Sequence, residues 1–351
     1  MNTEKPSHYD ALLFVSFGGP EGREDVLPFL ENVLRGKPVP RERMLEVAEH
    51  YYHFDGVSPI NGQNRKLINA VKMELEDQQI QLPIYWGNRN WHPMLNDTLE
   101  EMQKDGVKRA LVFITSAYSS YSGCRQYREN IEEAKSTLAD DIPETDKIRV
   151  FYNHPGFVNT IANLLIESLN KFDESVREKA TILFTAHSIP DSMAANCSYA
   201  SQLNETARLV MQEVGGNPWH LVYQSRSGAP SQPWLEPDVC DFIETLNAKE
   251  SPSHLAVVPI GFISDHMEVM FDLDIEAKEM CEELNINMVR VPTVGTSPQF
   301  VKMIVELIRE RTENIEKRSL GDRGPNHDVC PIDCCLYTPK RPPIQGRPGG
   351  R

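Results

Sequence analysis

Short apolar runs that alternate with longer helical patterns constrain the fold of this chain more than any other feature of its sequence. Each run is rich in Val, Ile and Phe and is apolar along its whole length, so both of its faces must be covered. Such runs are typical of parallel sheets that carry helices on both sides. The eight expected strands cover residues 11–17, 84–87, 110–115, 148–152, 181–185, 220–224, 255–260 and 288–291.

Four strands in each half predict an α/β fold of two similar Rossmann-like domains, each with a parallel four-stranded sheet flanked by helices. We expect an N-terminal domain over residues 8–150, covered by a C-terminal helix at about 297–316, and a second domain over residues 151–296. Residues 317–351 are rich in Pro, Gly and Arg and are expected to form an irregular tail that contains cysteines. Ligands bind beyond the carboxyl ends of strands in such sheets, so two facing sheets predict a cleft between the domains.

The charge balance and the hydropathy limit the classes of partner. The chain has 36 Lys and Arg against 51 Asp and Glu, a formal net charge of −15, which argues against a protein whose main task is binding nucleic acid. No stretch approaches the roughly 20 apolar residues that span a bilayer, and the polar start has no apolar signal core. We therefore expect a cytoplasmic enzyme, a monomer or homodimer, with peripheral membrane contact left open.

His187 stands at the end of the strand expected at residues 181–185, in the stretch "FTAHSIP". A lone histidine is most often a packing residue. Ligand sites, however, collect at the carboxyl ends of strands in parallel sheets. An imidazole titrates near neutrality, so His187 is a candidate base or metal ligand.

Three carboxylates follow the strand expected at residues 255–260. Glu268, Asp272 and Glu276 recur at steps of four, which places them on one stripe of a helix, and a π-bulge would change their drift around it. An acidic solvated face is the common interpretation of such a row, yet like charges at this spacing repel and no Lys or Arg lies within residues 265–277. A row of carboxylates in a cleft can pass protons or hold a divalent cation. Together with His187 it offers mixed nitrogen and oxygen ligands for a first-row metal.

Four polar or Gly-containing segments are expected as loops at strand ends. The segment 223–239 carries Trp234, which is either a packing anchor or a flat wall for a large aromatic ligand. The segment 16–22, "SFGGPEG", lacks the G-x-G-x-x-G fingerprint, so no nucleotide site is inferred. The other two expected loops cover residues 53–65 and 116–130.

Several motifs in a fixed order resemble the ferrochelatases, enzymes that insert ferrous iron into a porphyrin at the end of heme synthesis. The motifs are "SFGGPEG", "GVSPINGQNR", "GNRNWHP", "FTAHSIP", "QSRSGAP" with "PWLEPDV", and "IGFISDHMEVMFDLDIE". The likeness runs from about Tyr9 to Arg311, and its detail is most similar to the actinobacterial branch, which favours coproporphyrin III over protoporphyrin IX. The resemblance implies a chelatase-like fold with an active-site cleft and a lyase that forms nitrogen–metal bonds.

The resemblance also implies roles for individual residues. His187 and Glu268 correspond to the family's catalytic pair on the metal-insertion path, and Asp272 and Glu276 continue that path. Phe17 stands where one branch has a tyrosine that ligates the iron, so tyrosinate ligation of the product is not expected. The residues expected to contact the porphyrin, with Trp234 added from its loop, are Phe17, Ser58, Arg89, Tyr127, Trp234 and His266.

The cysteines form a second candidate site. Seven cysteines in a long chain do not suggest a disulfide framework, and "CPIDCC" gathers Cys330, Cys334 and Cys335 near the end. From the residues alone, free thiols in a disordered tail and a structural zinc site are both open. The resemblance adds a third possibility, because some ferrochelatases bind a [2Fe–2S] cluster through one internal and three C-terminal cysteines. It implies a cluster on Cys124, Cys330, Cys334 and Cys335, with a structural or sensing role.

Other functions stay open at this point. A cobalt or nickel chelatase for another tetrapyrrole would use the same His and Glu chemistry. A non-catalytic tetrapyrrole- or metal-binding protein, built as two α/β lobes around a cleft as in solute-binding proteins, would not need the carboxylate row. An iron–sulfur regulator would need a nucleic-acid surface, which the charge does not favour.

Overall fold

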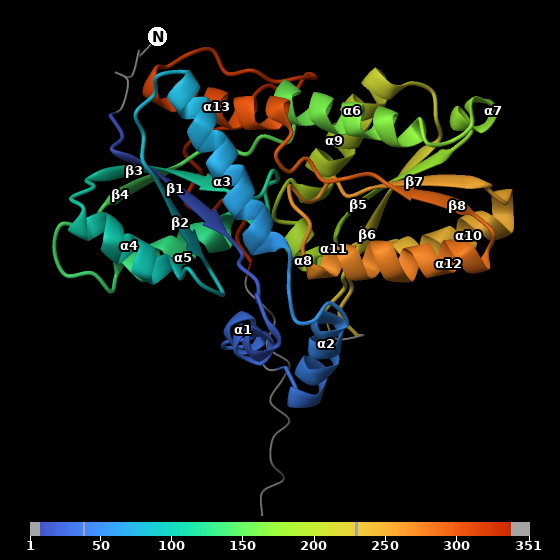
Figure 1. Cartoon of the computed structure of the whole chain (residues 1–351), viewed down its shortest axis with the longest axis horizontal. Coiled ribbons are helices and arrows are strands. Elements are labelled where there is room, and N and C mark those ends of the chain that lie inside the picture. Colours follow the sequence, from blue (N-terminus) through green and yellow to red (C-terminus); the bar gives the residue numbers. More distant parts are fainter. Residues whose placement is uncertain (1–7, 38, 229–230, 338–351) are drawn as a thin grey trace, which may run out of the picture.

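The first half of the chain forms one parallel four-stranded sheet. The computed structural model describes residues 8–37, 39–228 and 231–337 (Figure 1). The strands of the first sheet are β1 (Ala11–Ser16), β2 (Ile84–Asn88), β3 (Arg109–Ile114) and β4 (Glu144–Lys147). Their order is β2-β1-β3-β4, and every pair is parallel.

The second half repeats this arrangement. Its strands are β5 (Thr181–His187), β6 (Trp219–Gln224), β7 (His254–Val258) and β8 (Asn287–Arg290). Their order, β6-β5-β7-β8, corresponds to that of the first sheet, and every pair is again parallel. The prediction of two parallel four-stranded sheets flanked by helices is therefore confirmed.

One expected strand is wrong. Residues 148–152 are buried, four of them apolar and the fifth Arg149, but the chain there has left the sheet, and β4 lies just before it at Glu144–Lys147. The backbone N–H of Ile148 donates to the carbonyl of Val112 (2.9 Å), which follows the last β3–β4 pair. An edge strand pairs with a neighbour on one side only and tolerates polar side chains. The polar sequence Glu144–Lys147 can therefore form β4. The apolar run beyond it is buried instead in the core between the two sheets.

Helices cover both faces of each sheet, as Figure 1 shows. The first sheet lies between α3 (Ile60–Asp77) and α13 (Pro298–Thr312) on one side and α4 (Leu95–Lys104) and α5 (Gln126–Lys135) on the other. Alternate side chains of β1 explain this. Leu12 and Phe14 face the core that also holds residues of the second sheet, while Leu13 and Val15 face the core of α4 and α5.

The second sheet is covered in the same manner. Its helices are α6 (Pro155–Leu169) and α9 (Tyr199–Val214) on one side and α10 (Val239–Glu250) and α12 (Ala277–Glu283) on the other. The C-terminal helix α13 packs against both α3 and α6, so it joins the two halves. The division of the chain near residue 150 stays a prediction.

Two helices extend from the first half towards the second. α1 (Val26–Val33) and α2 (Arg41–His53) lie below the two sheets in Figure 1. Their small core includes Phe29 and Tyr51 from the first half and Met267 from the second. The remaining helical segments are η1 (Arg23–Asp25), η2 (Tyr121–Arg125), α7 (Glu174–Arg177), α8 (Asp191–Ala194), α11 (Met267–Val269) and η3 (Met270–Glu276).

Two of the expected loops are partly helical. The segment 116–130 turns into the π-helix η2 at Tyr121 and then into α5, and the segment 53–65 enters α3 at Ile60. The helical parts of these segments cover only six residues (60–65) and ten residues (121–130). Both are shorter than the window of about 11–18 residues over which a helical period shows in a sequence.

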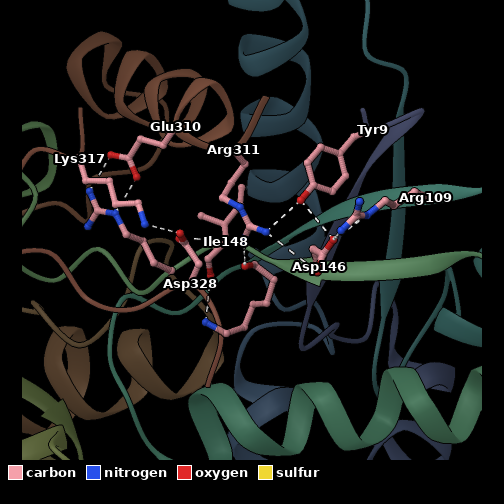
Figure 2. Close-up of polar contacts among 10 residues, drawn as sticks. Tyr9, Arg109, Asp146, Ile148, Glu310, Arg311, Lys317 and Asp328 are labelled. Carbon is pink, nitrogen blue, oxygen red and sulfur yellow. Dashed lines mark hydrogen bonds and ion pairs between the residues drawn. The ribbon is translucent and has the colours of Figure 1, made fainter. Parts of the chain in front are cut away.

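Residues 313–337, which end the described part of the chain, contain neither helix nor strand. A buried ion pair anchors their start, because Arg149 Nε lies 2.7 Å from Glu310 Oε2 and Arg149 also donates to the carbonyl of Arg318 (2.9 Å). Figure 2 shows Arg311 between Tyr9 and Asp328. Its Nη2 donates to the Tyr9 hydroxyl (2.9 Å), and its Nη1 lies 4.0 Å from Asp328 Oδ1. The expected disorder of the last residues concerns 338–351, which lie outside the described residues. Among the helices of the described residues, none has the length and apolarity required to cross a bilayer.

Candidate active site

His187 is the last residue of β5, at the carboxyl end of the second sheet. Its Nδ1 is in hydrogen-bond contact with the carbonyl oxygen of Ser188. A carbonyl can only accept, so Nδ1 carries the proton and Nε2 presents its lone pair in the neutral ring. The hydroxyl of buried Tyr199 donates to the His187 carbonyl (3.1 Å), which fixes the backbone beneath the ring.

The lone pair of His187 faces a carboxylate. Its Nε2 lies 3.8 Å from Glu268 Oε2, and the two side chains are 31% and 41% exposed, so solutes can reach both. His266 Nδ1 lies 3.9 Å from the same carboxylate oxygen. Burial lowers the pKa of His266, and His187 adds to this while Glu268 opposes it, which favours the neutral ring. The structure thus brings His187 close to His266 and Glu268, which belong to a motif about eighty positions further along the chain.

The carboxylate row continues along a π-helix, η3. Asp272 accepts hydrogen bonds from Gln224 Nε2 (3.1 Å) and from the hydroxyl of Ser225. Burial raises the pKa of Asp272 to about 7, and the charges of Glu268 and Glu276 add to the rise. Burial also raises the pKa of Glu276, together with the charge of Asp238. The three carboxylates therefore act on one another electrostatically, and π-helical turns are frequent at functional sites.

Asp265, from the same motif, has a different environment. Its carboxylate lies 2.9 Å from Arg290 Nη1, and its backbone N–H donates to Gln63 Oε1 of α3 (2.8 Å). These contacts tie the loop after β7 to the first half of the chain. Asp265 thus positions the segment that carries Glu268 and is itself neutralised by Arg290.

Three of the expected porphyrin contacts lie together in the first half. The guanidinium of Arg89 lies over the ring of Tyr127 (4.5 Å) and near that of Phe17 (5.7 Å), and its Nε donates to Asn130 (2.7 Å). Tyr127 is 5% exposed and belongs to the core beneath the first sheet. Ser58 is also buried, against Gly19. Arg89 and Phe17 are the more accessible members of this group.

Trp234 lies against the segment that follows His187. Its backbone forms an antiparallel bridge with Pro190, and the side chain is packed on Gly228, where a Cβ atom would come within 2.2 Å of the indole nitrogen. The indole N–H is buried and has no hydrogen-bond partner among the described residues. Trp234 thus packs residues 225–228 and 231–237 against the segment that follows His187.

Three residues of the site were not predicted from the sequence, and all precede α3. The ring of His50 in α2 stacks on Phe271 at 3.9 Å between centroids, next to the carboxylate row. Burial raises the pKa of Tyr51 well above its usual range, and the Glu268 charge adds to this. Burial also lowers the pKa of Lys37, with Arg89 adding to the effect and Glu268 opposing it. The His- and Tyr-rich end of α2, "HYYH", is the only signal in the sequence that could have indicated this contribution.

The four cysteines expected to act together come from two segments that the fold brings into contact. Cys124 in η2 hydrogen-bonds with Cys330, and Cys334 Sγ lies 3.6 Å from Cys335 Sγ. The Cys124 contact lowers the pKa of Cys330 to about 4, and Lys147 adds to this. All seven cysteines are free thiols.

Two further groups near these thiols were missed. His327 joins Cys330 and Cys334, with all three ligand atoms within 4.8 Å of one another. Cys197 acts electrostatically on Cys334 and Cys335. His327 precedes the cysteine motif by only three residues, a spacing that could have indicated it.

Comparison with known proteins identifies the family of this chain. The ferrochelatase family model matches residues 9–312. A ferrochelatase from Rhodopirellula baltica is 57% identical over 339 residues, covering 96% of each chain. A coproporphyrin III ferrochelatase from Streptomyces griseus is 48% identical over 365 residues, covering 97% of each chain. The cobalt complex of the sirohydrochlorin chelatase SirB from Bacillus subtilis subspecies spizizenii aligns with a TM-score of 0.49 and 13% identity, over 88% of this chain and 97% of that chain.

The fold is that of an α/β protein with two parallel sheets, the second of which carries an imidazole and carboxylates at its strand ends, where ligand sites of such sheets collect. The chain belongs to the ferrochelatase family and is an enzyme that inserts ferrous iron into a porphyrin.

Proposed function

We propose that the porphyrin substrate is coproporphyrin III and that His187 and Glu268 form the insertion site. The name and 48% identity of the Streptomyces griseus relative support the choice of porphyrin. The 3.8 Å separation of His187 Nε2 and Glu268 Oε2 is the observation that carries the site assignment. It puts a free nitrogen lone pair and a carboxylate within reach of the same pyrrole proton or incoming ion.

The chemistry requires two proton acceptors. A free-base porphyrin carries two N–H protons, and insertion of Fe²⁺ gives the metalloporphyrin and releases both. His187 Nε2 removes a pyrrole proton as a general base, since its Nδ1 proton is held by the Ser188 carbonyl. Glu268 takes the second proton and passes it along Asp272 and Glu276 to solvent. A carboxyl with a pKa of about 7, as at Asp272, exchanges protons readily at neutral pH.

The same carboxylates supply the iron. Fe²⁺ is the substrate, and oxygen ligands hold such an ion weakly enough to release it to the four porphyrin nitrogens. Contacts at the ring edge then bend the macrocycle so that the nitrogen lone pairs tilt towards the ion. We assign these contacts to the six residues predicted from the sequence, which are Phe17, Ser58, Arg89, Tyr127, Trp234 and His266.

The test is anaerobic incubation of the chain with Fe²⁺ and either coproporphyrin III or protoporphyrin IX, followed by the Soret shift. The proposal expects faster turnover with coproporphyrin III. Faster turnover with protoporphyrin IX would reassign the substrate, and a metalation rate equal to that of buffer with both porphyrins would refute the proposed activity. A parallel measurement with Co²⁺ and Ni²⁺ separates iron insertion from a general preference for divalent ions.

We also propose a [2Fe–2S] cluster on Cys124, Cys330, Cys334 and Cys335. The donor set fits, because four thiols gather at one place and Lys147 and Arg128 act on them with positive charge. When bound, the cluster supplies a covalent tie between η2 and the tail and a one-electron redox centre. Iron, sulfide and visible absorption of anaerobically purified protein test this, and colourless protein after reconstitution with iron and sulfide would refute it.

Three further expectations belong to this proposal. The enzyme works in the cytoplasm as a monomer or homodimer, with or without peripheral contact to a membrane. The chain divides at about residue 150 into two domains followed by the tail. Cell fractionation, light scattering and limited proteolysis measure these properties one by one.

A further inference from the structure

Three polar side chains on the first two turns of α3 have no role in the proposed function. Asn61 and Asn64 are fully buried, and Gln63 is half-buried. All three belong to the sequence motif "GVSPINGQNR", of which only Ser58 was expected to contact the porphyrin. Buried amide groups cost free energy unless they are hydrogen-bonded, so their partners show which parts of the molecule they hold.

Two loops of the first half carry the expected porphyrin contacts Phe17 and Arg89. They cover residues 17–19 and 89–92, and we call them the wall loops. Asn90 joins them, because both its backbone N–H (3.1 Å) and its side-chain amide (3.2 Å) donate to the carbonyl of Phe17. The wall loops therefore form one unit at the carboxyl ends of β1 and β2.

Asn61 ties both wall loops to α3. Its amide donates to the carbonyl of Gly19 (3.2 Å) in one loop and to that of His92 (3.1 Å) in the other. Its oxygen accepts from Asn88 Nδ2 (3.3 Å), and that amide also donates to the His92 carbonyl (2.9 Å). The start of α3 thus fixes where the two loops lie.

Asn64 reaches the end of β1 from the next turn of the helix. Its Nδ2 donates to the Ser16 hydroxyl (2.9 Å), which donates to Asn88 Oδ1 and accepts from Trp86 Nε1 (3.3 Å). Ser16, Asn64 and Asn88 are all fully buried. Buried polar groups that bond to one another in this way hold a single arrangement, so the ends of β1 and β2 give the wall loops a rigid base.

The corresponding positions of the second sheet carry the proposed catalytic histidine. Ser16 pairs with Asn88 in register, and His187 pairs with Gln224 at the same places of β5 and β6. The side chain of His187 is 31% exposed, whereas Ser16 is fully buried. The two halves therefore differ in task, because the second exposes a reactive group at its strand ends and the first provides a support.

Gln63 faces the second half of the chain. Its Oε1 accepts from the backbone N–H of Asp265 (2.8 Å), and its Nε2 lies 3.5 Å from Asp265 Oδ2. Asp265 begins the segment that carries Glu268. Gln63 follows Asn61 by two residues, and Figure 1 shows this end of α3 between the two sheets. One end of α3 therefore holds the wall loops and the Glu268 segment at once.

We propose that Asn61, Gln63 and Asn64 are positioning residues that set the separation between the wall loops and Glu268. The inference rests on the proposed function, because it takes the wall loops as a porphyrin contact and Glu268 as part of the insertion site. Iron insertion depends on this separation, since a displacement of about 1 Å at a reacting group lowers a rate by about 100-fold. The three residues act through the groups that they hold.

Substitutions of similar side-chain size test the two sides of α3 separately. Asn61→Leu removes the donors to the wall loops, so the arrangement that binds porphyrin becomes less populated. The dissociation constant for coproporphyrin III, measured from the Soret band without iron, rises about tenfold or more, and Asn64→Leu acts in the same direction. Gln63→Met releases the Glu268 segment instead. It lowers kcat about 10- to 100-fold and changes the dissociation constant by less than about threefold.

Two variants separate these effects from a general loss of stability. Thr160→Ala removes a buried hydroxyl that donates to the Gly156 carbonyl (2.6 Å) within α6, and it leaves kcat and porphyrin binding unchanged. Asn61→Ser keeps one donor and weakens porphyrin binding less than Asn61→Leu, so the effect is measurable even where the Leu variant does not fold. Unchanged porphyrin affinity in the Asn61 variants, unchanged kcat in Gln63→Met, or equal losses in Thr160→Ala overturn the proposal.

Amide hydrogen exchange measures the same ties without any porphyrin. The Asn90 N–H exchanges faster in Asn61→Leu, and the Asp265 N–H exchanges faster in Gln63→Met. A wild type that binds neither coproporphyrin III nor protoporphyrin IX refutes the proposed function, and the exchange rates then decide the inference alone. Faster exchange at the two amides supports the ties of α3, and unchanged exchange at both overturns them.

Discussion

Replacement of Asp272 by Asn is expected to stabilise the folded protein while it impairs iron insertion. The ionised carboxylate of Asp272 is partly buried beside Glu268 and Glu276, and the loss of solvent raises its pKa to about 7. Asn keeps an oxygen that accepts the hydrogen bonds of Gln224 and Ser225 but carries no charge. Active sites often hold such unfavourable charges because the chemistry needs them.

The size of the effect follows from the pKa. A rise from the ordinary value of 3.8 to about 7 corresponds to about 4 kcal/mol of unfavourable interaction in the ionised state. Solvent contact at this partly exposed side chain reduces the value, so we expect a gain of about 2–4 kcal/mol for Asp272→Asn.

The raised pKa of Asp272 also sets how the stability difference between the wild type and the variant changes with pH. Below about pH 3.8 the carboxyl is protonated in both folded and unfolded chains, so it contributes no difference. As the pH rises towards 7 the unfolded chain releases the proton and the folded chain does not, so the wild type progressively loses stability relative to the variant. Above about pH 7 the difference is constant.

The assay is urea unfolding of wild type and Asp272→Asn at about pH 5 and about pH 8. Glu283→Gln, an exposed carboxylate on α12, is the matched control and should stay within about 0.5 kcal/mol of the wild type. A difference between Asp272→Asn and wild type that does not grow with pH, or a variant less stable at the higher pH, would show that the carboxylate is not held at an unfavourable site.

Two further substitutions probe the scaffold. Glu310→Ala leaves the fully buried Arg149 guanidinium without its partner and should lower the free energy of unfolding by about 3–5 kcal/mol, whereas Glu313→Ala removes an exposed pair and should change it by less than about 1 kcal/mol. Equal effects in urea unfolding would argue against the anchoring of the tail. Tyr199→Phe removes the hydroxyl that donates to the His187 carbonyl and should lower kcat more than it raises KM, with the pH profile of kcat displaced. An unchanged pH profile would leave Tyr199 with a packing role alone.

The strands of both sheets were largely predictable because a strand that is buried on two faces has a continuous apolar run in the sequence. β1 and β5 are buried along almost their whole length, and their apolar runs indicate them. β4 was missed because an edge strand can be polar, and "ETDK" has no apolar run. The first half of α5 was taken for a loop because only three of the ten residues of the helix are buried.

The residues of the candidate site also fall into those that the sequence indicates and those that only the fold brings together. His187 and Glu268 were predictable because a strand end is visible in the sequence and both residues follow one. His50 and Tyr51 were not, because they lie 218 and 217 positions before Glu268 and reach it only through the packing of α2 on the segment after β7. His327 was missed because only cysteines were weighed as ligands, although it precedes Cys330 by three residues.

The most direct test of the account is the rate of anaerobic iron insertion by His187→Ala, measured next to its affinity for the porphyrin. The account predicts a fall in kcat of about 10²–10⁴-fold, the usual contribution of a general base, with porphyrin binding close to that of the wild type. His220→Ala, which removes an imidazole packed on Phe242, is the matched control and should insert iron normally. Near-normal turnover by His187→Ala would contradict the account.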